Sequence, residues 1–429
     1  MTTTVTTKTG YGTRVGGSFK GMLVGLLFFA AGTALLWWNE GRAVRTGDAI
    51  KEAAGALLEL PDPSRLEPAF EGKLVHATAR ASAASTISDA RFAVQAPAHA
   101  LRLDCESEIY QWVETRASES EKKLGGSVVT TTVYDYQRAW RPLPENSDAF
   151  KESGHENSQI LPAGVWESDR VTAKDVTFGA YRLGENFVSA IGRAEPLPLE
   201  KTAEQIAALQ SALFGVPPTP AAPAAESAAA PLPASSAADA PAAEATASAA
   251  PVVPQKVFLL GDGSLYLGEN PSSPAIGDVR VRFSFVPETD ASLIAVVRGD
   301  TFTPYLAANG TRFSRIATGT LSAADMIENA RQGNRTLAWL LRALAWLLLF
   351  LAVRMVLSPL AVIGDVVPFI GSILSFGTGL VAFAVASVWG LIVAAIAWIR
   401  FRPLLALSLL ALAAALAVAL LLRKRRAAA

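Results

Sequence analysis

The sequence contains few of the residues on which disulfide bridges, metal sites and strong electrostatic attraction depend. Of its 429 residues, one is cysteine, Cys105, and three are histidine. A single cysteine excludes an intrachain disulfide, and we expect Cys105 to be a buried structural thiol. The 38 basic and 38 acidic side chains cancel, so no net charge attracts nucleic acid or an acidic partner.

Motifs that would assign catalysis or metal binding are also missing. His76, His99 and His155 lie in no HExxH or close Cys/His spacing, so we expect neither metal nor cofactor. The sequence contains no P-loop, dinucleotide fingerprint or nucleophile elbow. We therefore expect a protein that is not an enzyme.

Two weaker constellations stay open. His155 is followed by a glutamate and an asparagine, and a loop histidine beside a carboxylate can act as a general base or simply support a turn. Asp104, Glu106 and Glu108 share one face if their segment is a strand, which gives either a paired-carboxylate site or a solvated face. We favour the turn and the solvated face.

Long apolar runs dominate both ends of the chain. A transmembrane helix needs about twenty apolar residues, at about 1.5 Å each, to cross a hydrocarbon core about 30 Å thick. Four segments meet this length, and they are residues 19–38, 337–357, 376–399 and 403–422. The sequence therefore predicts four transmembrane helices. The first could also be a cleaved signal, but it is long and ends in WWNEGR without a pair of small residues, so we interpret it as an anchor.

The short flanks of these runs are basic, and such flanks determine orientation more than the charge of a long domain does. The N-terminal tail, residues 1–18, is basic, and the C-terminal tail, residues 423–429, contains four consecutive cations. We expect both tails in the cytoplasm and residues 39–335 on the opposite side of the membrane. Two arginines between the last two runs would then face outward, against the same rule.

Residues 39–335 have the pattern of a sheet-rich α+β domain. Apolar spacing predicts helices over residues 48–60 and 199–214, and Ser322 is expected to cap a further helix that Gly333 and Asn334 end. Strands are predicted where residues alternate or are β-branched, at residues 73–79, 100–113, 127–140, 171–181, 257–267 and 278–286.

An Ala/Pro/Ser segment at residues 216–254 interrupts this domain. Its side chains cannot form a core, so we expect a disordered linker inserted in a surface loop, with the halves on either side folding together.

Residues 358–375, between two predicted spans, contain Asp365 among prolines and glycines that interrupt a helix. An ionisable group at membrane depth is costly and often functional. Because of Pro368 and its neighbours, we expect a re-entrant or interfacial elbow, in which Asp365 pairs with Arg354 or lies in cytoplasmic water. We expect Arg342, in the preceding span, to extend toward the outer surface.

Small residues recur at every fourth position in the predicted spans. Such stripes allow close helix packing, including self-association, but also arise by chance in an alanine-rich chain. They lie at Gly21 and Gly25, at Ala382, Ala386 and Gly390, and at Ala411, Ala415 and Ala419.

Short strings along nearly the whole chain match one family pattern in order and separation. They are WNEGRAV (38–44), EGKLVH (71–76), IYQWVE (109–114), GHEN (154–157), GDVRV (277–281), PL with DVVPFIGS (359–372) and RPLL (402–405). Together they resemble the LUMA family, also called transmembrane protein 43, from which the Ala/Pro linker is a departure.

The resemblance implies one N-terminal span, a large domain outside the cytoplasm and a C-terminal hydrophobic cluster. Animal members look like nuclear-membrane and endoplasmic-reticulum proteins that organise complexes with emerin and lamins, without known catalytic residues. The Ala- and Arg-rich composition is typical of a bacterial protein, so only the general role carries over, and the expected location is a bacterial inner membrane with the large domain periplasmic or extracellular.

We therefore expect a multi-pass α-helical membrane protein with a large α+β, sheet-rich extracytoplasmic domain. Its expected role is a non-enzymatic scaffold that organises membrane protein complexes or supports envelope integrity or stress response. Its partners would be the lipid bilayer, copies of itself and unidentified membrane or envelope proteins, and not nucleic acid. The alternatives are a transport or channel component that uses Asp365 and a membrane-tethered hydrolase that uses His155 or the acidic strand.

Overall fold

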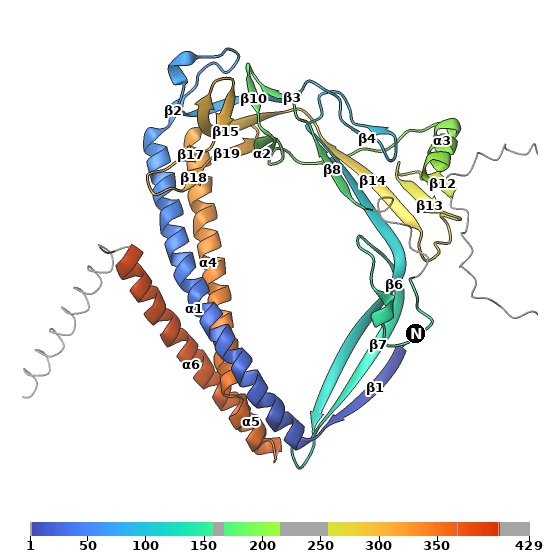
Figure 1. Ribbon diagram of the computed structural model, residues 1–429, viewed down its shortest axis with the longest axis vertical. Helices are drawn as coiled ribbons and strands as arrows, with labels where there is room; N and C mark the ends of the chain where they lie inside the picture. The colour runs from blue at the N-terminus through green and yellow to red at the C-terminus, as the bar shows by residue number, and fades with distance from the viewer. Residues whose placement is uncertain (1, 158–166, 215–255, 367, 402, 404–429) are drawn as a thin grey trace, which may run out of the picture.

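The computed structural model describes residues 2–157, 167–214, 256–366, 368–401 and 403. Long helices form one side of the molecule, and a long curved sheet forms the other (Figure 1). The two sides meet at both ends, so that the described chain forms a closed frame. The Ala/Pro segment, residues 216–254, and the predicted fourth span beyond residue 403 lie outside the described residues.

Four helices form the helical side, and they are α1 (Tyr11–Ala56), α4 (Ala323–Val356), α5 (Ser358–Gly364) and α6 (Pro368–Phe401). In the described chain, α1, α4 and the Phe376–Phe401 part of α6 are long and apolar enough to cross a membrane. They coincide with the predicted spans 19–38, 337–357 and 376–399. Leu27, Phe383 and Leu391 are among the apolar side chains exposed on them, as on helices that face lipid.

The helices pack through small residues. A Cβ at Gly25 of α1 would lie 2.9 Å from the carbonyl oxygen of Ala352 in α4, and one at Gly32 would lie 3.2 Å from that of Ala345. Ala382 in α6 is fully buried as well. These positions are therefore occupied by packing within one chain, and the stripe at residues 411–419 lies outside the described residues.

Three predicted helix boundaries are wrong. The helix predicted over residues 48–60 is not a separate one, because α1 runs unbroken from the membrane segment to Ala56, and Leu58–Glu59 is a strand. Gly333 and Asn334 do not end the Ser322-capped helix, since α4 continues through them. The predicted elbow is a short helix, α5, and α6 already begins at Pro368.

Tertiary packing explains the continuity of α1 and α4 above the membrane segments. Ile50 and Ala53 of α1 are fully buried in one apolar cluster with Met326 and Ile327 of α4. Burial of such side chains is worth about 1.5–3 kcal/mol each for the larger ones, which outweighs the cost of about 1 kcal/mol for a glycine within a helix. The cap at Ser322 is confirmed, because its side chain accepts the Asp325 N–H.

The first sheet forms the long curved side of the frame (Figure 1). Its main path is β1–β7–β6–β14–β13–β12, with β8 and β11 attached. The strands are β1 (Thr2–Thr9), β6 (Arg102–Lys122), β7 (Val128–Arg141), β8 (Asp169–Thr172), β11 (Glu195–Pro196), β12 (Lys256–Leu259), β13 (Leu265–Gly268) and β14 (Val279–Val286).

The second sheet lies where the frame meets the upper ends of α1 and α4 (Figure 1). Its strands are β2 (Leu58–Glu59), β3 (Leu74–Ala83), β9 (Val176–Phe178), β10 (Tyr181–Leu183), β15 (Thr289–Arg298), β16 (Thr301–Thr303) and β19 (Arg315–Thr318). Smaller elements are β4 (Ser88–Asp89), β5 (Val94–Gln95), β17 (Tyr305–Leu306), β18 (Arg312–Phe313), α2 (Glu185–Val188), α3 (Ala203–Phe214) and two 3₁₀ turns, Pro68–Phe70 and Ser147–Ala149.

One core joins the two halves of the sheet-rich region. Leu103 of β6, before the Ala/Pro segment, and Phe283 of β14, after it, are buried in the same apolar cluster. The prediction that the halves fold together is confirmed, as is the α+β, sheet-rich character. Cys105 also lies in this core, and burial raises the pKa of its thiol to about 12, so it stays neutral as expected of a structural cysteine.

The N-terminal tail is not free. Thr2–Thr9 forms β1, which pairs antiparallel with β7 of the region predicted to lie beyond the membrane. β1, Val128–Asp135 of β7 and Thr115–Lys122 of β6 together form a three-stranded extension that we call the polar ribbon. The ribbon returns to the lower end of α1 and α5 (Figure 1).

Substitution of Gly25 by alanine should destabilise the α1–α4 pair. The new Cβ would press against backbone and the Met355 Cβ at 2.9 Å, and such overpacking costs about 1–3 kcal/mol. Gly21→Ala is the matched control, since its nearest neighbour would be 4.0 Å away. Thermal unfolding in mild detergent should show a Tm below that of wild type for Gly25→Ala and an unchanged Tm for Gly21→Ala. Equal Tm values for the two variants would contradict the packing.

Candidate functional site

Asp365 joins three parts of the chain at the lower end of the frame. Its carboxylate is buried, with the residue 2% exposed, and it receives Arg14 Nη2 on Oδ2 at 2.5 Å and Lys122 Nζ on Oδ1 at 2.7 Å. Arg14 lies in the first turns of α1, Lys122 at the end of β6, and Asp365 directly after α5. Both carboxylate oxygens are therefore engaged by cations.

Backbone contacts complete this junction. Arg14 Nη1 donates to the Gly126 carbonyl at 2.6 Å, and the Gly125 N–H donates to the Val366 carbonyl at 3.1 Å. Gly126 adopts φ +77°, and a side chain there would collide with the ring of Tyr11. A glycine is needed at this turn, because only it permits both the backbone conformation and the close approach. We call the contacts of Asp365, Arg14, Lys122 and the 125–126 turn the lower junction.

The charges determine the protonation of Asp365. Burial by itself raises the pKa of this carboxyl, but the hydrogen bonds and charges of Lys122 and Arg14 outweigh burial and hold the pKa below its usual value. The carboxylate is thus ionised at neutral pH and pairs with both cations.

The lower junction corrects the predicted role of Arg354. Arg354 is exposed and its guanidinium lies beside Gly379 of α6, where a Cβ would be 3.3 Å from Nη1. The partners of Asp365 are Arg14 and Lys122 instead. Pro368 begins α6, where a fixed φ and a missing N–H favour the first helical turn.

The junction also bears on membrane orientation. Lys122 belongs to the region 39–335, which was expected on one side of the membrane, whereas Arg14 and Asp365 were expected on the other. Since all three meet directly, a bilayer crossed by residues 19–38 leaves the tip of the ribbon on the same side as the N-terminal tail. Lys122, within the range 39–335, therefore contacts two residues that were predicted on the other side of the membrane.

Glu40 joins three helices at the opposite end of the membrane segments. It is fully buried in α1 and receives Arg342 of α4 at 2.6 Å (Nε to Oε1) and 2.9 Å (Nη2 to Oε2), and Trp398 Nε1 of α6 at 2.9 Å. Arg342 therefore does not extend to the surface as predicted, because a bidentate carboxylate fixes it. The WNEGR string places Glu40 at the end of the first predicted span, but no signal near it in the sequence identified Arg342 as its partner.

Neighbouring polar groups extend the contacts around Glu40 and add further links between α1 and α4. Asn39 is fully buried and donates to the Ala338 carbonyl at 3.0 Å, and Arg42 donates to Asn334 Oδ1 at 3.1 Å. Asn334 in turn donates to the Ala43 carbonyl at 2.9 Å. The residue expected to end a helix therefore cross-links α4 to α1.

His155 is a packed aromatic residue. It is 5% exposed, stacks on Tyr136 with ring centroids 4.1 Å apart, and meets Trp112 edge to face at 4.6 Å. Its Nδ1 is buried and has no hydrogen-bond partner among the residues that the structure describes. The neighbouring Asn157 hydrogen-bonds to the backbone of β6. Its side-chain oxygen accepts the Trp112 N–H, and its side-chain nitrogen donates to the Trp112 carbonyl.

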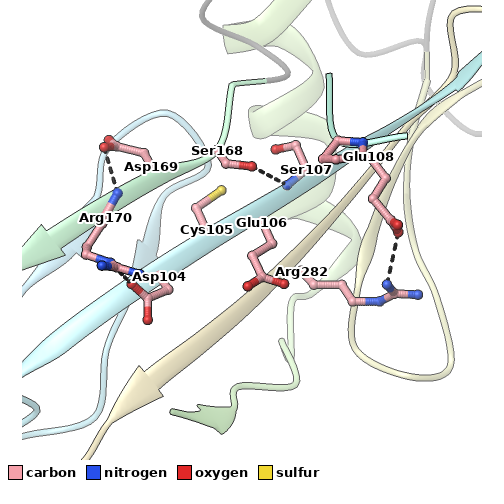
Figure 2. Close-up of a pocket in the computed structure, with 10 residues that line it drawn as sticks. Asp104, Cys105, Glu106, Ser107, Glu108, Ser168, Asp169, Arg170 and Arg282 are labelled. Atoms are coloured by element: carbon pink, nitrogen blue, oxygen red, sulfur yellow. Dashed lines mark hydrogen bonds and ion pairs between the residues drawn. The ribbon is translucent and has the colours of Figure 1, made fainter. Parts of the chain in front are cut away.

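The acidic residues of β6 line a cavity of about 600 Å³ (Figure 2). Asp104 pairs with Arg170 at 2.7 Å and Arg102 at 2.9 Å, and Glu108 pairs with an arginine of β14, Arg280, at 2.6 Å. Glu106 is exposed. Arginines thus neutralise two of the three carboxylates, and no group of three or more metal-binding side chains gathers within the described residues.

Membrane-length helices that are joined to a sheet-rich region through the buried Asp365 define this chain as a transmembrane protein. A family model described as Transmembrane protein 43 matches residues 109–403, more than half of the chain. The chain belongs to the Transmembrane protein 43 family, which confirms the resemblance.

Curated relatives extend the likeness over almost the whole chain. Rat Transmembrane protein 43 is 27% identical over 406 residues, covering 92% of this chain and 88% of its own length. The human protein is 26% identical over 415 residues, covering 94% and 90%. The Drosophila melanogaster homolog is 32% identical over 168 residues, covering 38% and 43%. Comparison with solved structures finds no significant match.

Acidification should open the lower junction. Because the pKa of Asp365 is lowered in the fold, its contribution is complete above the ordinary aspartate value, about 3.9, and is lost as pH falls below it. Hydrogen exchange of the Gly125 amide should therefore speed up between pH 5 and pH 3 after correction for intrinsic rates. Asp365→Asn should exchange fast at both pH values, and a pH response equal to wild type in this variant would refute the assignment.

Removal of Glu40 alone should destabilise the helices more than removal of the pair. Glu40→Leu leaves the partly buried Arg342 without its carboxylate, which costs up to about 3 kcal/mol, whereas an apolar replacement of both partners is often neutral. Thermal unfolding should therefore rank Glu40→Leu below Glu40→Leu/Arg342→Leu. The reverse order would show that the pair does not hold the helices as described.

Proposed function

We propose that this protein is a non-enzymatic membrane scaffold that holds its sheet-rich region in a fixed position on the bilayer and organises membrane protein complexes there. The observation that carries the proposal is the closure of the frame at both ends. The upper ends of α1 and α4 pack on the second sheet, and the lower ends bind the ribbon through Asp365. A frame closed in this way resists bending between membrane and sheet.

The state of Asp365 supports a structural role over transport. A carboxylate that binds a transported ion must exchange partners, whereas both oxygens of Asp365 are held by Arg14 and Lys122. His155 likewise supports packing over catalysis, because Tyr136 stacks on its ring and Trp112 packs against it edge to face. We propose an inner bacterial membrane as the location, with unidentified membrane or envelope proteins as partners.

Proximity labelling from the sheet-rich region in native membranes tests the proposal. Wild type should label a reproducible set of membrane or envelope proteins, and Asp365→Asn, which opens the frame, should label fewer of them. Asp300→Asn is the matched control, since it removes an exposed carboxylate paired with Arg182 at 2.6 Å. Absence of a reproducible set with wild type would contradict the scaffold.

Ion flux in proteoliposomes tests the transport alternative with the same variants. The scaffold predicts background flux for wild type and Asp365→Asn alike. A flux above background that Asp365→Asn abolishes and Asp300→Asn keeps would replace the scaffold by a channel or transporter.

A further inference from the structure

The polar ribbon has two open edges in the described part of the chain. β1 pairs with β7 on one side, and no described strand pairs with its other side. On β6, the edge opposite β7 pairs with β14 only as far as Ile109. Further along, the side chain of Asn157 forms hydrogen bonds with the backbone of Trp112. From Thr115 to Lys122 this edge has no described strand beside it. Both edges therefore present unpaired backbone N–H and C=O groups.

The two open edges match in direction, length and height. β1 and β6 each run antiparallel to the central β7, so they run in the same direction. Lys8 and Glu121 both pair with Val129, and Thr6 and Glu119 both pair with Thr131. Each residue of β1 thus lies level with a residue of β6, two strands away.

The charges of the edges are complementary. Lys8 is the one charged residue of β1, and the residue of β6 level with it is Glu121, with Glu119 two residues away on the same face. Lys122 faces the other way and is held by Asp365. A β1 strand placed beside the open edge of β6 would therefore bring Lys8 next to glutamates.

The position of the ribbon makes open edges costly. The ribbon lies across the frame from the lower part of the helices and meets them at the start of α1 (Figure 1). It consists largely of threonine, serine and charged residues, which are unsuited to lipid, and an unpaired strand edge at membrane depth leaves several polar groups unsatisfied. Pairing of the edges removes this cost.

We infer that copies of this chain assemble edge to edge, with β1 of one copy paired in parallel to Thr115–Lys122 of the next. The contact is heterologous, so each copy offers one free edge to the next, and the assembly is a ring where the rotation between copies closes. In the aligned register Lys8 lies beside Glu121 of the next copy. The assembly goes beyond the proposed function, since it holds whether the ring serves as a scaffold or encloses a path for solutes.

Disulfide trapping tests this assembly in native membranes. Within one copy Thr6 and Glu119 are two strands apart, about 9–10 Å, which is too far for a disulfide. Between copies they become neighbours. The double variant Thr6→Cys/Glu119→Cys should therefore give, on oxidation, a ladder at multiples of 45.1 kDa, with the single variants reporting any background from the buried Cys105.

The matched control is Thr6→Cys/Ser120→Cys, whose second side chain points to the opposite face of β6 and should give no ladder. Lys8→Glu should reduce trapping severalfold, and Lys8→Glu/Glu121→Lys should restore it. No ladder in the first double variant, an equal ladder in the control, or products that are not multiples of the chain mass would overturn the inference. The last result would indicate a strand from a different protein at the open edge.

Discussion

The structure depends on one buried carboxylate that holds two cations from distant parts of the chain. Asp365 brings α1, the end of β6 and the α5–α6 joint to one point through Arg14 and Lys122. A buried charge is unfavourable unless it is paired on every side, and here both oxygens are paired. Because the ribbon is polar and exposed, little apolar burial could replace this attachment. The lower end of the frame is therefore maintained by electrostatics, and the upper end by packing.

The upper part follows the opposite logic. Ile50 and Met326 bury apolar surface between α1 and α4, and Glu40 with Arg342 fixes the relative position of the membrane helices. Apolar burial gives cohesion without direction, whereas a bidentate ion pair gives a defined register. Together they explain why α1 stays one helix of 46 residues through membrane and water.

Much of the fold could be predicted from local pattern, and the site could not. Apolar runs and strand alternation indicated the membrane helices and the strands 127–140 and 278–286, because these signals lie within each segment. Asp365 stood out for the same local reason. Its partners are 351 and 243 residues away in sequence, so nothing near Asp365 identified them, and Arg354 was the wrong choice because proximity in sequence was the available criterion. The N-terminal strand was missed because a threonine-rich tail has no apolar face.

The attachment of the ribbon tip to the α5–α6 joint is the claim on which the frame, its closure and the edge-to-edge assembly rest. The most direct measurement is the distance between spin labels at the exposed Leu124 and Ile363 in liposomes at neutral pH. The structure predicts one narrow distribution at short distance, since residues 125 and 366 share a backbone hydrogen bond of 3.1 Å. A broad distribution, or one at the separation of opposite membrane surfaces, about 40 Å, would contradict it.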